Sequence, residues 1–166
     1  MMKVRLTILW LVAVVGLLFV NYTIYGREEL INNSQPILLE LAPVDPRSLI
    51  QGDYMALRYK IAADLENQES LPLRGKLVIN VAENGVAAFV RVDDGTPLGP
   101  NERLLNYYKH EWQIDLGAPS FFFEEGTADA YDAAQYGEMR VAEGGTSVLI
   151  GLRDENLQPL GPGQQP

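Results

Sequence analysis

The 166-residue sequence contains no cysteine, which excludes a disulfide framework, a cysteine-ligated zinc or iron–sulfur centre and a thiol nucleophile. It has a single histidine, His110, so a Ser-His-Asp triad would have to use that residue. Basic residues are few, with 13 against 22 acidic residues and a pI near 4.5, and this balance argues against nucleic acid as a partner. The loop at 94–100 has prolines where phosphate-binding amides would be needed, so we also expect no nucleotide and no cofactor.

The N-terminal segment is the most apolar part of the chain. Residues 6–20 read LTILWLVAVVGLLFV, and the uncharged stretch continues to Tyr25. Twenty residues in a helix span about 30 Å, which predicts a transmembrane helix over residues 6–25. A cleaved signal peptide would need small residues at an A-x-A-like spacing, and the residues after Val20 are mostly too bulky. The pattern therefore favours a retained signal anchor.

The charges that flank this segment predict its orientation. Lys3 and Arg5 precede it, so residues 1–5 are expected to form a cytoplasmic stub of a bacterial inner-membrane protein. The part that follows Tyr25 holds all 22 acidic residues and the other basic ones, and we expect it in the periplasm. Such an acidic domain is repelled by anionic lipid, so we expect it to bind a protein and to contact the bilayer only through the anchor.

The remainder predicts one mainly β domain over residues 36–157. A linker or helix extension at 26–35 precedes it, and a disordered tail rich in proline and glycine follows at 158–166. Many short strands with a single short helix indicate an antiparallel sandwich or a partly open barrel. A parallel sheet would need helices between its strands.

Alternation of apolar and polar residues indicates the strands. It predicts that Met55, Leu57, Tyr59 and Ile61 share the buried face of one strand. In a second, longer strand it predicts that His110 points inward and is packed. The expected strands outside the hairpins cover residues 37–41, 54–61, 103–116 and 121–123.

Turn chemistry predicts two hairpins. Asn84-Gly85 is typical of a type I′ turn between two apolar runs within residues 75–92, and Gly144-Gly145 lies in the same position within 138–152. The similarity of 81–85 to 141–145 is explained by shared turn chemistry. We expect one helix, over residues 128–135 with Thr127 as its N-cap.

Residues 52–59 read Gly-Asp-Tyr-Met-Ala-Leu-Arg-Tyr, and this segment resembles the GDYXXLXY family of bacterial membrane-anchored proteins at every defined position. Parts of 41–49 and of 124–141 are similar to two further blocks of that family. The resemblance implies a protein that occurs near polytopic membrane proteins, and it transfers no catalytic residue. The candidate motif and interaction residues are Gly52, Asp53, Tyr54, Leu57, Tyr59, Glu124, Glu125, Tyr131, Tyr136 and Arg140.

The motif has both a structural and a functional interpretation. Gly52 supplies backbone freedom at a turn, and Asp53 is suited to accept backbone N–H groups before the strand begins. This favours a structural role, and a binding site at the start of the strand stays open. We therefore predict an accessory or interaction subunit of a larger inner-membrane assembly, bound to a polytopic membrane protein and without catalysis of its own.

Two alternatives remain. Residues 46–53 faintly resemble the serine-containing segment of signal peptidases, with Ser48 as nucleophile and Lys60 or Lys76 as base. A cation- or ligand-sensing domain would use carboxylates, which are the oxygen ligands that hard cations prefer, although their spacing matches no defined metal site. These carboxylates are Glu124, Glu125, Asp129, Asp132 and Glu138.

Overall fold

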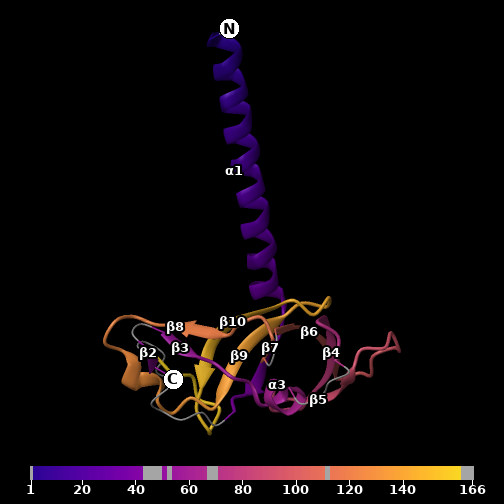
Figure 1. Ribbon diagram of the computed structural model, residues 1–166. Coiled ribbons are helices and arrows are strands. Elements are labelled where there is room, and N and C mark those ends of the chain that lie inside the picture. The colour runs from indigo at the N-terminus through magenta and orange to yellow at the C-terminus, as the bar shows by residue number, and fades with distance from the viewer. Residues whose placement is uncertain (1, 43–49, 52–53, 67–70, 111–112, 162–166) are drawn as a thin grey trace. The chain divides into compact units, whose positions relative to one another are not determined.

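The computed structural model describes residues 2–42, 50–51, 54–66, 71–110 and 113–161, with the side chains of 2–7, 9, 23, 26–33, 50 and 51 left out. The chain forms two compact units, residues 1–34 and 35–166. This division lies at the end of the expected linker over 26–35. Figure 1 shows a single helix in the first unit and the sheets in the second.

The first unit consists of helix α1 (Met2–Asn33). Its described apolar side chains are exposed, from Ile8 to Tyr25. The helix ends before Pro36, since the residue that precedes a proline avoids the helical region. Among the residues that the structure describes, no helix is long and apolar enough to span a bilayer. The transmembrane anchor over residues 6–25 stays a prediction.

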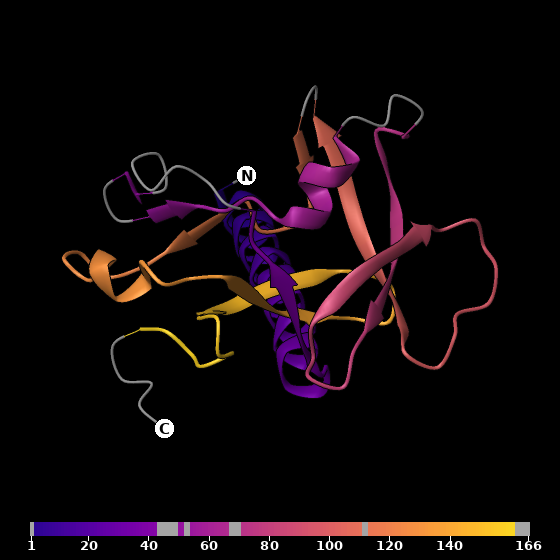
Figure 2. The ribbon, with the colours of Figure 1, turned by 90° about the horizontal axis from the view of Figure 1, so that it is seen from below.

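The second unit is mainly β, and its antiparallel sheets curve into a half-barrel (Figure 2). One sheet has the strand order β5-β4-β6-β7, the next β1-β9-β10 and the third β2-β3-β8. This confirms the mainly β, antiparallel prediction. The strands are β1 (Pro36–Glu40), β2 (Ile50–Gln51), β3 (Tyr54–Ala56), β4 (Arg74–Val81), β5 (Ala87–Val92), β6 (Glu102–His110), β7 (Gln113–Asp115), β8 (Ser120–Phe122), β9 (Tyr136–Val141) and β10 (Ser147–Arg153).

The core consists of two apolar clusters. The larger lies between the four-stranded sheet and β1 and β9, and its fully buried members include Leu39, Leu77 and Tyr107. Tyr107 faces Gly75 across the β4–β6 ladder, and only glycine leaves room there for the tyrosine ring. The smaller cluster contains Met55, Tyr131 and Leu152 under the sheet β2-β3-β8.

Both hairpins are confirmed, and their turns share one geometry. The N–H of Ala82 donates to Val86 O at 2.9 Å and that of Ala142 donates to Thr146 O at 2.8 Å. In each loop a single residue, Gly85 or Gly145, has a positive φ. A type I′ turn needs positive φ at both central residues. The type I′ prediction at Asn84-Gly85 is therefore wrong, and each loop has three residues with glycine in the left-handed position.

The strand expected over residues 54–61 is too long. It ends at Ala56, and helix α3 (Lys60–Leu65) begins four residues later. The predicted burial is confirmed for Met55, Tyr59 and Ile61, whereas Leu57 is only partly buried. Tyr59 and Ile61 lie beyond the strand, so the prediction of one strand face shared by all four residues is wrong. The helix has only six residues, too few for a 3.6-residue period to be recognised in the sequence.

The strand expected over residues 103–116 is a hairpin of β6 and β7, and the predicted phase of β6 is reversed. Leu105 and Tyr107 are fully buried, whereas Tyr108 is 46% exposed and His110 is exposed. The prediction of an inward, packed His110 is therefore wrong. Apolar side chains occur on both faces of β6, so its alternation is ambiguous, and a shift of one residue inverts every side chain.

Two other predictions need correction. The helix expected over residues 128–135 is a single 3₁₀ turn, η1 (Ala128–Tyr131), and the Thr127 hydroxyl donates to Glu124 O instead of capping it. The tail is ordered at its start, because the Leu160 N–H donates to Leu152 O at 2.9 Å. The prediction of disorder from Gln158 onward is wrong for residues 158–161.

Candidate functional site

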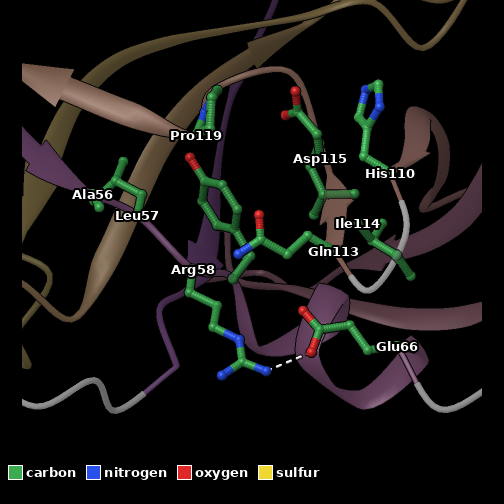
Figure 3. Close-up of a pocket in the computed structure, with 11 residues that line it drawn as sticks. Ala56, Leu57, Arg58, Glu66, His110, Gln113, Ile114, Asp115 and Pro119 are labelled. Carbon is green, nitrogen blue, oxygen red and sulfur yellow. Dashed lines mark hydrogen bonds and ion pairs between the residues drawn. The ribbon is translucent and has the colours of Figure 1, made fainter.

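The second half of the Gly-Asp-Tyr motif lines an open cavity of about 770 Å³. One wall consists of residues 56–59 and the other of residues 113–116 at β7, with His110 and Pro119 beside them. Figure 3 shows Ala56 and Leu57 on one side and Ile114 and His110 on the other. Apolar surface predominates in the lining, as in most ligand-binding clefts. We call this cavity the motif cleft.

An ion pair borders the motif cleft. Arg58 Nη2 donates to Glu66 Oε2, which belongs to the C-cap residue of α3 (Figure 3). The Arg58 side chain is about half exposed, whereas that of Glu66 is 16% exposed. A surface ion pair contributes only about 0–1 kcal/mol to the stability of the fold. We therefore infer that this pair mainly positions the Arg58 side chain at the cleft.

Tyr59 fixes the motif to the opposite wall. Its ring is 2% exposed, and its hydroxyl donates to Ala118 O at 3.0 Å. The segment is held further by the Leu57 N–H, which donates to Pro119 O at 2.8 Å. Burial of the phenol, and secondarily the negative charge of Asp115, raises the pKa of Tyr59 above its ordinary value of 10.0.

This raised pKa predicts a loss of stability in alkali. Tyrosines of the unfolded chain ionise near pH 10, while the folded Tyr59 keeps its proton to higher pH. The unfolded state then binds fewer protons, so the stabilisation is complete below pH 10 and the free energy of unfolding falls above it, by at most about 1.4 kcal/mol per pH unit. Urea denaturation between pH 9 and 11.5 should show a shallower fall for Tyr59→Phe. Tyr108→Phe is the control, because Tyr108 is exposed. If the free energy of unfolding of Tyr59→Phe fell with pH as steeply as that of the wild type, this explanation would be contradicted.

The motif packs against the later sequence block that resembled the same family. A Cβ atom added to Gly137 would lie 3.0 Å from Tyr59 Cε1 and 3.3 Å from Leu149 Cδ1. Gly137 lies in the middle strand of the sheet β1-β9-β10, opposite Leu39. The glycine of this block thus makes room for the last tyrosine of the motif.

Two other candidate residues lie on opposite faces of the smallest sheet. Tyr54 pairs with Phe122 across the β3–β8 ladder, with ring centroids 5.8 Å apart, and Phe122 is 74% exposed. Tyr131 is buried below, where its ring contacts Phe121 and Phe123. A shallow hollow of about 470 Å³ lies beside Tyr131.

The structure brings only some of the candidate residues together. Leu57 and Tyr59 belong to the motif cleft. Tyr136 and Arg140 lie on β9, and Glu124 and Glu125 are exposed after β8, outside the lining of this cleft. Gly52 and Asp53 lie outside the described residues.

The serine-lysine alternative gains no support from Lys60. Its Nζ donates to both carboxylate oxygens of Glu40, at 2.9 and 3.0 Å, and this raises its pKa. A lysine that serves as a general base must be neutral, and this ion pair favours the charged form. Lys76 lies in β4 opposite Asn106, and Ser48 lies outside the described residues.

The cation alternative depends on how the carboxylates are arranged. Among the described residues, no group of three or more histidine, aspartate or glutamate side chains is arranged to hold a metal ion. Glu138 is used structurally, since its Oε2 accepts from Arg153 Nε at 2.8 Å.

Sequence reasoning missed most of the second wall. Gln113, Asp115 and Glu66 were not singled out, and His110 was assigned to the core. The antiparallel pairing of β6 with β7 brings His110, Gln113 and Asp115 to the cleft, and Glu66 reaches it from the C-cap of α3. No local signal marks these residues, because their role depends on the pairing of strands about 50 residues after the motif.

Comparison with known proteins supports the resemblance of the motif. The model of the family described as GDYXXLXY protein matches residues 16–152. No curated protein and no solved structure matches the chain. The match spans α1 from Gly16 and nearly all of the β domain, including both walls of the motif cleft. The chain therefore belongs to the GDYXXLXY family.

Proposed function

We propose that the protein is a single-pass subunit of a bacterial inner-membrane assembly, with residues 6–25 as its anchor and the β domain in the periplasm. The uncharged run in α1 and the basic residues before it support this topology. The domain's charge supports a protein as its partner, since anionic lipid repels it. The partner is a polytopic membrane protein.

One observation carries the binding role. Leu57, a defined residue of the motif, is only partly buried and lines the motif cleft, whereas Tyr59 in the same wall is buried. A motif with a structural role alone would turn its defined residues inward and leave no cavity beside them. Here the same segment anchors the core and borders a cleft of the size that binding sites have.

Copurification from the native membrane tests this function. The full-length protein, extracted in mild detergent, should recover a polytopic membrane protein in a constant ratio. Tyr54→Ala should lower that recovery severalfold, because Tyr54 is a defined motif residue at the start of β3, the strand whose last residue, Ala56, lines the motif cleft.

Tyr108→Ala is the matched control, because it removes an exposed tyrosine from β6, outside the motif. Both variants must keep the wild-type melting temperature. Recovery of the protein alone, under conditions that preserve other membrane complexes, would contradict the proposed function.

A further inference from the structure

Strand β7 is the edge of its sheet at the motif cleft. The strand order β5-β4-β6-β7 leaves one side of β7 without a neighbouring strand in the described part of the chain. An open strand edge presents N–H and C=O groups to which another extended chain can pair.

The register shows which groups face outward. Lys109 opposes Ile114 on β7, and the Lys109 N–H donates to Leu73 O at 2.8 Å, on the β4 side of β6. Lys109 therefore turns its backbone away from β7, and Lys109–Ile114 is the pair without mutual hydrogen bonds. The N–H and C=O of Ile114 consequently point toward the free edge, and neither bonds to another described residue.

The lining of the motif cleft agrees with this geometry. Gln113, Ile114, Asp115 and Leu116 are consecutive, and all four line it. Successive side chains of a strand point to opposite faces, so a cavity that meets all three residues of β7 in a row lies along the strand's edge. Across the cleft, residues 56–59 are consecutive as well.

The charges of the cleft indicate the occupant's chemistry. Arg58 and Glu66 neutralise each other. Asp115 forms no ion pair within the described part of the chain, and its Oδ1 accepts the Gly117 N–H at 2.7 Å. With His110 neutral, the described lining residues carry a formal charge of −1, within a strongly acidic protein. A basic side chain complements this site.

We propose that the motif cleft binds an extended, non-helical segment of the polytopic partner, which adds to β7 as a strand and places a lysine or arginine beside Asp115. This inference rests on the proposed function. Main-chain pairing with Ile114 supplies affinity, and the charge near Asp115 selects the segment.

Photo-crosslinking in the native membrane tests the inference. A benzoylphenylalanine at Gln113, which is exposed on β7, should crosslink the full-length protein to the partner. The crosslinked residue should lie in an extramembrane segment without helix, within two residues of a lysine or arginine. The same probe at Ala88, exposed on β5, should give no such product.

Matched variants separate shape from charge. Ala56→Trp should reduce crosslinking at Gln113 more than tenfold by filling the cleft, and Ala88→Trp should not. Asp115→Asn keeps the oxygen that accepts the Gly117 N–H and removes the charge, so it should reduce crosslinking about three- to fivefold. Glu83→Gln, at an exposed hairpin tip, is its control.

The outcomes distinguish this inference from the proposed function. Crosslinks to a helix, to lipid or to a second copy of the chain would overturn the strand-addition proposal. So would a complex that copurifies normally while the Gln113 probe gives no product, and in that case the accessory role would stand. Absence of any complex would overturn both.

Discussion

Replacing Tyr59 by alanine should lower the free energy of unfolding by about 3–5 kcal/mol, the usual effect of removing a large aromatic side chain from a core. The ring is 2% exposed and belongs to the larger apolar cluster. Tyr59→Phe should cost only about 1–2 kcal/mol, because it leaves the Ala118 carbonyl without its hydrogen bond and keeps the packing. Urea denaturation of the full-length protein in detergent, followed by near-ultraviolet circular dichroism, measures both.

The difference between the two variants separates packing from hydrogen bonding. Tyr108→Ala is the control for loss of an aromatic ring, and since Tyr108 is 46% exposed its effect should stay within about 0.5 kcal/mol. A loss below 1 kcal/mol for Tyr59→Ala would mean that the motif contributes little to the core. The motif would then act through the cleft alone.

The sequence predicts those parts of the fold that depend on local chemistry. The hairpins around Gly85 and Gly145 were found because a positive φ at a tight turn demands glycine. Their turn type was wrong, since Asn84 does not share the positive φ. Local residues thus identify a reversal of the chain, and its detailed geometry depends on how the two strands align.

Features that depend on distant pairing were predicted poorly. The phase of β6 is decided by its pairing with β4, where Leu105 lies opposite Leu77 and Tyr107 covers Gly75. Within β6, the neighbouring Leu104 also fits an inward face. The motif cleft shows the same limit, because the motif indicates one wall while the second comes from a hairpin about 50 residues later.

Replacing Gly137 by valine should lower the free energy of unfolding by about 1–3 kcal/mol through overpacking. A Cβ atom there would lie 3.0 Å from the Tyr59 ring, and valine adds two methyl groups beyond it. Gly151→Val is a matched control on the neighbouring strand β10, where the nearest atom to an added Cβ is Glu138 Oε2 at 3.9 Å. Its effect should be within about 0.5 kcal/mol, as measured by the same urea denaturation.

Combining the two substitutions tests whether the two family-like blocks act as one unit. In the Tyr59→Ala background, the ring that would collide with a valine at position 137 is absent. Gly137→Val should therefore lower the free energy of unfolding less in that background, or even raise it by filling the space that the ring leaves. The coupling free energy between the positions should lie in the range of about 0.5–3 kcal/mol found for residues in contact. Additive effects would mean that the sheet absorbs the valine elsewhere. Coupling would explain why a tyrosine at the end of the motif accompanies a glycine 78 residues later, since the glycine leaves room for the tyrosine ring.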